Sequence, residues 1–126
     1  GKLESLLLYE NQLSGPIPPE LGMLGNLYDL QLQNNKLENG IPAELFSATQ
    51  LEILRLDFNF LTGGLPSEIG NLASLKDFRL DQNSLFGTIP SQIRALSNLE
   101  NFLLNLESRF YLLVGQLRNC AIMVFQ

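Results

Sequence analysis

Apolar residues return along the chain in a frame that repeats every 24 residues. The frame begins at Leu3 and restarts at Leu27, Leu51, Leu75 and Leu99. An asparagine marks the same place in each full copy, and these four residues are Asn11, Asn35, Asn59 and Asn83. A fixed period of roughly 20 to 50 residues indicates stacked structural units, because one unit cannot bury its hydrophobic face alone. The pattern therefore predicts a solenoid.

Each copy opens with a segment of the form L-x-x-L-x-L, in which apolar and polar residues end in strict alternation. Alternation predicts a short strand with one buried face. Stacked copies would set these strands side by side as a parallel sheet. The side chains predicted to point inward are Leu30, Leu32, Leu54, Leu56, Phe78 and Leu80.

The recurrent asparagine follows each strand, where the chain turns away from the sheet and leaves backbone groups without ladder partners. An asparagine amide can both donate and accept a hydrogen bond there, whereas an aspartate could not donate. We therefore predict that Asn11, Asn35, Asn59 and Asn83 form a structural ladder through the interior.

The second half of each copy contains a proline that is followed, two residues later, by Glu20, Glu44, Glu68 or Gln92. Proline fits a first helical turn, and a glutamate there faces the positive end of the helix dipole. This pattern predicts one short helical turn in each copy, with the acidic column explained by helix-start stabilisation. Gly22 and Gly70 are expected to permit the turn back.

The motif L-x-x-L-x-L-x-x-N-x-L-x-G-x-I-P, nearly intact in residues 3–18 and 78–90, resembles the leucine-rich repeat family. Gly15 with Ile17 and Pro18 resembles its plant-type class, and the same element returns at Gly63 and Gly87. The resemblance implies an α/β fold, a right-handed superhelical solenoid. Its parallel sheet would line the concave face, with short helical or 3-10 turns on the other side.

The frame divides the chain into residues 1–104, which hold four 24-residue copies and a fifth strand, and residues 105–126. In the second copy Asn39 stands in the glycine slot and Ala48 replaces a leucine, so we expect looser packing there. The last segment is predicted to be an irregular end or a degenerate repeat. Its apolar content is too high for solvated disorder.

Two explanations compete for the loss of the frame in residues 105–126, where Glu107 stands in the place of the next asparagine. Leu113, Gly115 and Leu117 echo Leu85, Gly87 and Ile89, which would make a last copy lengthened by four residues with Arg118 in the proline slot. The other explanation is an erroneous or truncated end of the gene model.

Composition fits one globular domain, since the 126 residues are 45% hydrophobic and 17% charged. The net charge of −5 argues against a nucleic-acid partner, because phosphates require a basic face. No stretch approaches the roughly 20 apolar residues that span a bilayer, so direct membrane insertion is not predicted. Because the chain opens on Gly1 and Lys2 without a signal peptide, we expect it to be a fragment of a longer protein.

Catalytic signatures are sparse in this sequence. It has no histidine, no nucleophile elbow, no phosphate-cradling glycine loop and no metal-ligand spacing of Cys and His. Cys120 is the sole cysteine and is predicted to be inert. Asp57 and Asp81, about 5 Å apart on neighbouring strands, have the separation of a retaining glycosidase pair, but any solenoid column produces that spacing. We therefore predict no enzyme activity, no cofactor and no metal site.

The outward strand positions define the candidate binding face. One column runs through Gln31, Arg55 and Arg79, and its neighbour runs through Tyr9, Gln33, Asp57 and Asp81. Two arginines beside two aspartates suit a partner that carries carboxylates, amides or hydroxyls. Tyr9 and Phe58 add aromatic anchors of the kind found in binding hot spots. Alternatively, the charges neutralise one another on a solvated sheet, each pair contributing about 0 to 1 kcal/mol.

The resemblance implies a non-catalytic recognition module that binds a protein or peptide ligand on the concave face. Such modules belong to larger receptor-like proteins and lie at the extracellular face of the plasma membrane. A structural spacer, a cytosolic interaction scaffold and a secreted hydrolase inhibitor remain alternatives.

Overall fold

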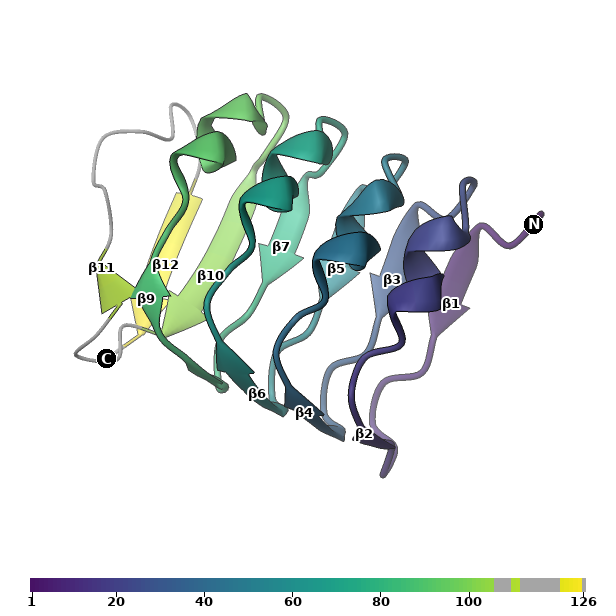
Figure 1. The fold of residues 1–126 in the computed structure, drawn as a ribbon, viewed down its shortest axis with the longest axis horizontal. Coiled ribbons are helices and arrows are strands. Elements are labelled where there is room, and N and C mark those ends of the chain that lie inside the picture. The colour runs from purple at the N-terminus through teal and green to yellow at the C-terminus, as the bar shows by residue number, and fades with distance from the viewer. Residues whose placement is uncertain (106–109, 112–120, 126) are drawn as a thin grey trace.

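The main sheet runs the length of a solenoid of stacked coils (Figure 1). The computed structural model describes residues 1–105, 110–111 and 121–125. In this part of the chain six strands make one parallel sheet in the order β1-β3-β5-β7-β10-β12. They are β1 (Ser5–Leu7), β3 (Asp29–Gln31), β5 (Ile53–Arg55), β7 (Asp77–Arg79), β10 (Asn101–Asn105) and β12 (Ala121–Phe125).

Shorter elements complete each coil. Figure 1 shows the 3-10 turns stacked on the side opposite the main sheet. These turns are η1 (Pro19–Met23), η2 (Ala43–Ser47), η3 (Ser67–Asn71) and η4 (Ser91–Ala95). A second parallel sheet joins β2 (Ser14–Gly15), β4 (Lys36–Asn39), β6 (Phe60–Gly63) and β8 (Ser84–Leu85), and β9 (Gly87–Thr88) pairs with β11 (Phe110–Tyr111). The predicted α/β solenoid with short helical turns is confirmed.

The 24-residue period sets the strand register. Leu6, Leu30, Leu54, Phe78 and Phe102 lie opposite one another in successive strands. All six side chains predicted to point inward are buried. The rings of Phe78 and Phe102 stack with 5.4 Å between their centroids. Each such large apolar side chain stabilises the fold by about 1.5 to 3 kcal/mol when it is fully buried.

The recurrent asparagines tie neighbouring coils together. The Nδ2 of Asn59 donates to Leu56 O in its own coil, at 3.1 Å, and to Leu32 O in the preceding coil, at 3.0 Å. Its Oδ1 accepts from Leu37 N–H at 3.0 Å. Asn35 and Asn83 repeat this arrangement. Their partners are backbone groups of adjacent coils, so these amides supply the hydrogen bonds that the sheet cannot provide where the chain turns.

The residue before each asparagine takes a left-handed backbone conformation. The φ values are 54° at Glu10, 57° at Asn34, 54° at Phe58 and 57° at Gln82. Asparagine tolerates this region, whereas a bulky residue does so only at a cost. The backbone at Phe58 is therefore strained. Phe58 is also 49% exposed.

The prolines and glycines of the helical turns act differently from expectation. Pro18 is extended, with φ −64° and ψ 123°, and precedes η1 as its N-cap. Its carbonyl accepts from Leu21 N–H. Gly22 lies inside η1, where a Cβ would come 1.8 Å from Glu44 O in the next coil. Gly22 thus permits close coil stacking. That it also permits the turn back stays a prediction.

The second coil is as well packed as its neighbours, so the expected looseness is not observed. Asn39 itself adopts φ 67° and takes over the role of the missing glycine. Ala48 is fully buried, and the large side chain of Phe46 is buried in the same coil.

Of the C-terminal strands, β12 extends the main sheet, whereas β11 pairs with β9 in a separate two-stranded sheet. In β12, Ala121 pairs with Asn101 of β10, a step of 20 residues where the earlier coils use 24. In β11, Phe110 lies opposite Gly87, a step of 23 residues. The expected alignment of Gly115 with Gly87, in a copy lengthened by four residues, lies outside the described residues. The expectations for Glu107, Leu113, Leu117, Arg118 and Cys120 lie outside the described residues. The division at residue 104 stays a prediction.

Within the described ranges, no helix has the length and apolar character needed to cross a membrane.

Candidate functional site

The strand face is the outward side of the main sheet, opposite the 3-10 turns. Register places Gln31, Arg55 and Arg79 side by side on β3, β5 and β7. Two residues further on, backbone hydrogen bonds between successive coils set Gln33, Asp57 and Asp81 in a second column. We call this second column the end column, because it follows the ends of the strands.

Burial separates the two columns. The arginine side chains are partly exposed, 27% for Arg55 and 33% for Arg79. The end column is buried, with exposed fractions of 4% for Gln33, 2% for Asp57 and 7% for Asp81. The alternative of mutually neutralising charges on a solvated sheet differs from the structure in one respect, because the two aspartates are buried and not solvated. The pairing of a buried polar group affects the stability of the fold more than a surface ion pair does, because a buried group without a partner costs about 1 to 3 kcal/mol.

Arg55 and Asp57 form a bidentate ion pair along one strand face. Arg55 Nε donates to Asp57 Oδ1 at 3.2 Å, and Arg55 Nη2 donates to Asp57 Oδ2 at 2.8 Å. Parallel guanidinium and carboxylate groups are among the strongest and most directional hydrogen-bonding pairs in proteins. The buried charge of Asp57 is thus compensated within its own coil.

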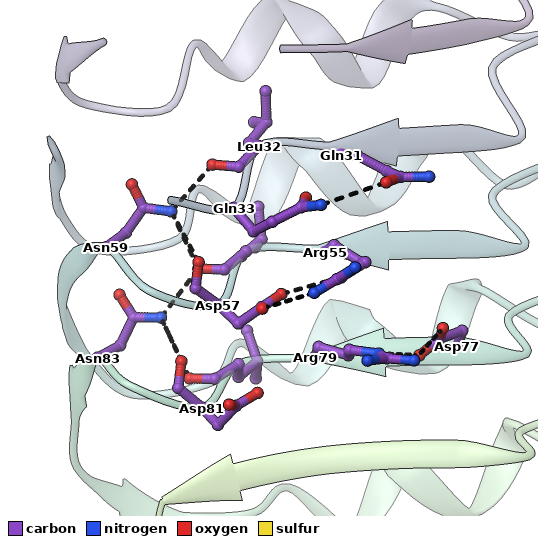
Figure 2. Close-up of polar contacts among 12 residues, drawn as sticks. Gln31, Leu32, Gln33, Arg55, Asp57, Asn59, Asp77, Arg79, Asp81 and Asn83 are labelled. Atoms are coloured by element: carbon purple, nitrogen blue, oxygen red, sulfur yellow. Dashed lines mark hydrogen bonds and ion pairs between the residues drawn. The ribbon is translucent and has the colours of Figure 1, made fainter. Parts of the chain in front are cut away.

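Arg79 pairs with the carboxylate two residues before it, whereas Arg55 pairs with the one two residues after it (Figure 2). Its Nε and Nη2 donate to the two carboxylate oxygens of Asp77, at 2.9 and 3.1 Å, and the side chain points away from Asp81. The hydrogen bond to Asp77 raises the pKa of Arg79 above its ordinary value. Within the end column, Asp57 therefore has an arginine partner on its own strand face, whereas Arg79 does not pair with Asp81.

Three side chains along β3 and the residues after it form a relay. Gln31 Nε2 donates to both oxygens of Asp29, at 3.0 and 3.3 Å, and Gln33 Nε2 donates to Gln31 Oε1 at 3.2 Å. The relay fixes the rotamers of two amides that would otherwise be free to rotate. Polar groups held in place before binding lower the entropy cost of recognition.

Two acceptors of the end column have no donor. Among the described residues, no hydrogen-bond partner reaches the buried Oδ1 of Asp81 or the buried Oε1 of Gln33. Burial raises the pKa of Asp81 above its ordinary value, and the negative charge of Asp57 adds to the effect. The backbone N–H of Asp81 and the positive charges of Arg79 and Arg55 oppose the shift. Asp81 is thus a buried carboxyl group with incomplete compensation.

The aromatic residues predicted for the site lie at its margin. Tyr9 follows β1 and is 41% exposed, and Phe58 directly follows Asp57. Asp29 and Asp77 were absent from the predicted site, although they anchor Gln31 and Arg79. Alternate residues of a strand share one face, so the spacings D-x-Q and D-x-R already contained this signal.

The strand face presents side chains that can donate or accept hydrogen bonds. Fixed guanidinium groups, amides and carboxylates lie beside exposed aromatic rings, a combination typical of binding hot spots. Among the residues that the structure describes, no group of three or more His, Cys, Asp or Glu side chains is arranged to hold a metal ion.

Comparison with known proteins agrees with this architecture. The family model described as Leucine Rich Repeat matches residues 2–24 and 50–72. No curated protein matches the chain by sequence.

Solved structures give extensive matches. The plant peptide hormone receptor RGFR1, in complex with RGF2, is 32% identical with a TM-score of 0.85, and the match covers 96% of this chain and 24% of that one. The ectodomain of the membrane receptor kinase GASSHO1/SCHENGEN3 from Arabidopsis thaliana, in complex with CASPARIAN STRIP INTEGRITY FACTOR 2, is 36% identical with a TM-score of 0.83; coverage is 98% and 15%. A plant ice-binding protein is 30% identical with a TM-score of 0.73; coverage is 87% and 35%.

This chain thus spans about a quarter or less of the two receptors. The likeness extends over nearly all of its own length. Together with the 24-residue register and the asparagine bonds between coils, these matches show that the chain belongs to the plant-type class of the leucine-rich repeat family.

Proposed function

We propose that this chain is a non-catalytic recognition module that binds a peptide or protein ligand on its strand face. The observation that carries the proposal is the fixed set of polar side chains on that face. Arg55, Arg79, Gln31 and Gln33 each donate to a neighbouring side chain, so their positions are set before any ligand arrives. Such preorganisation reduces the side-chain entropy that is lost on binding.

A purely structural spacer needs the leucine core and the asparagine bonds, but it gains nothing from this face. Two buried acceptors that have no donor among the described residues, and a phenylalanine in the left-handed region, each lower stability. Local features that oppose stability concentrate at functional sites, where selection maintains them for another reason. This contrast favours recognition over the spacer.

The relatives support the type of partner. RGFR1 is a peptide hormone receptor solved with RGF2, and GASSHO1/SCHENGEN3 was solved with CASPARIAN STRIP INTEGRITY FACTOR 2. By analogy, we place this chain in a larger receptor-like protein, on the extracellular side of the plasma membrane. The fold alone does not carry the argument, because an ice-binding protein shares it.

Each predicted site residue has a role in this proposal. The exposed rings of Tyr9 and Phe58 would supply apolar contact at the margins, and Gln31, Arg55 and Arg79 would supply hydrogen-bond donors. Gln33, Asp57 and Asp81 would supply acceptors at the floor of the face.

The test is a selection of a phage-displayed library of random 12-residue peptides on the whole chain. Enriched peptides are then measured by fluorescence anisotropy against Phe58→Ser and, as a matched control, Phe60→Ser. Both rings are exposed, but Phe60 lies on β6 of the second sheet. We expect Phe58→Ser to weaken binding at least tenfold and Phe60→Ser to change it less than twofold.

Two outcomes would contradict the proposal. One is that no peptide is enriched, as a structural spacer predicts. The other is that enriched peptides bind both variants as tightly as the unaltered chain, which would place recognition on another surface.

A further inference from the structure

We infer that the end column binds a cationic group of the ligand, a primary ammonium or a guanidinium, at the carboxylate of Asp81. This inference rests on the proposed function and assigns the ligand chemistry of the same face. A lysine or arginine side chain of a peptide, or its free amino terminus, would supply the group.

Within the described part of the strand face, Asp81 takes part in no ion pair, and its buried Oδ1 has no donor. Arg55 is held by Asp57 through two hydrogen bonds, and Arg79 is held by Asp77 through two more. The edge of each guanidinium that best fits a carboxylate is therefore already occupied. Asp81 lies in the same column as Asp57, but neither of the two arginines drawn in Figure 2, Arg55 and Arg79, donates to it in the part of the chain that the structure describes.

The unpartnered oxygens provide the independent sign of a missing donor. Asp81 Oδ1 and Gln33 Oε1 are both buried, in residues only 7% and 4% exposed, and no described residue donates to either. A ligand N–H that reaches these atoms would recover the free energy lost by leaving them unpaired. Polar sites built this way select strongly for ligands that carry the matching donor.

The balance of charge favours a cation over a neutral donor. The strand face holds Asp29, Asp57, Asp77 and Asp81 against Arg55 and Arg79, an excess of two negative charges when all are ionised. A ligand carboxylate would have to approach these four carboxylates. The sequence-based expectation of a ligand that presents acceptors to the two arginines is therefore less well supported than a basic ligand.

The geometry also limits how a peptide would lie. Gln33 and Asp81 are separated by two coils, roughly 10 Å at about 4.8 Å for each strand step. An extended peptide covers about 10 Å in three residues. A ligand that crosses the strands would thus place its cationic group at Asp81 and an uncharged donor about three residues away at Gln33.

The probe for this inference is an N-acetylated, C-amidated tri-lysine peptide with a fluorescein label, compared with the same peptide carrying acetyl-lysine. We expect the tri-lysine peptide to bind at least tenfold more tightly than its acetylated form. Because this comparison uses the unaltered chain, it does not depend on how any variant folds.

Variants then locate the binding. Asp81→Asn should weaken tri-lysine binding at least tenfold, while Glu68→Gln, which removes one negative charge from η3 on the opposite side, should change it less than twofold. Equal losses in the two variants would overturn the inference, because general acidity would then explain the binding. Equal affinity for tri-lysine and its acetylated form would overturn it as well.

Failure of the inference can be separated from failure of the proposed function. If library peptides bind the strand face, lose affinity in Phe58→Ser and are indifferent to Asp81→Asn, the cationic site is overturned and the recognition face stands. If neither tri-lysine nor any library peptide binds, both are overturned.

Discussion

Asp57 and Asp81 occupy the same place in successive coils, but the arginines beside them pair differently. Arg55 pairs with Asp57, whereas Arg79 pairs with Asp77 and not with Asp81. The residue that precedes each arginine by two positions decides the outcome: it is Ile53 before Arg55 and Asp77 before Arg79. Isoleucine offers no acceptor, so Arg55 turns to Asp57. Asp77 offers a carboxylate on the other side, and Arg79 turns to it.

Replacing Asp77 with the residue of the preceding coil tests this explanation. In Asp77→Ile, Arg79 loses its partner and should turn toward Asp81, because a nearby cation favours the charged form of a carboxyl group. The pKa of Asp81 should fall, as measured by the pH titration of its carboxyl carbon in NMR spectra. An unchanged pKa would mean that Arg79 cannot reach Asp81.

Asp81 should also lower the stability of the fold at neutral pH. Its folded-state pKa is raised above the unfolded value, so its relative contribution is most favourable below the unfolded pKa and is lost as pH rises through the folded pKa. Asp81→Asn removes this loss and should raise the free energy of unfolding by about 1 kcal/mol at pH 7. The gain should vanish below pH 4, near the ordinary aspartate pKa of about 3.9.

Urea titrations of both proteins at several pH values measure this effect. A loss of stability in Asp81→Asn at pH 7 would contradict it, because the carboxylate would then have a structural partner. A gain in stability together with weaker binding would mark a residue kept for recognition.

At the scale of one element, the turn after each strand combines a left-handed residue with an asparagine that bridges two coils. The bridge is complete at Asn59, which bonds Leu32 and Leu37 of the preceding coil. Asn11 is exposed, and its Nδ2 donates to Leu8 and Tyr9 of its own coil, both at 3.1 Å. The same residue type in the same motif therefore has different energetic weight in two coils.

The two asparagines provide a matched pair of substitutions. Asn59→Ala should lower the free energy of unfolding by at least about 2 kcal/mol, since it leaves buried backbone groups without partners. Asn11→Ala should cost less than about 1 kcal/mol, because water replaces its bonds. Equal costs in chemical denaturation would show that the contacts between coils contribute little.

At the scale of the whole molecule, stability comes from coil-on-coil contact, as in other repeat proteins. Among the glycines of the described residues, Gly22 facing Glu44 and Gly70 facing Gln92 leave no room for a Cβ. A Cβ at Gly70 would lie 2.9 Å from the Cβ of Gln92, whereas Gly25 has no atom within 4 Å of its Cβ direction. Glycine is thus required at particular stacking points and is optional elsewhere.

Alanine substitutions distinguish these positions. Gly22→Ala should destabilise the fold by more than about 2 kcal/mol, because its Cβ would overlap the backbone of the next coil and force the coils apart. Gly25→Ala should stay within about 0.5 kcal/mol of the unaltered chain, as surface substitutions do. Thermal unfolding followed by circular dichroism measures both. Equal melting temperatures would contradict the close stacking at η1.

The sequence by itself determined the solenoid, its strand register and its buried side chains. The 24-residue period aligns Leu30, Leu54 and Phe78 in one column across the strands, and the two-residue alternation along each strand points this column inward. Local departures such as Asn39 did not disturb this frame, since the neighbouring coils impose the backbone that Asn39 adopts.

Only the tertiary structure decided the character of the strand face. The columns were visible in the sequence, but the burial of Gln33, Asp57 and Asp81 depends on the coils packed to either side. The sequence offers Arg79 two carboxylates at alternate positions, Asp77 and Asp81, and only the structure shows that it pairs with Asp77. The repeat period determines the strand position of each side chain. Its rotamer and the neighbouring coils determine which partner its charged group meets.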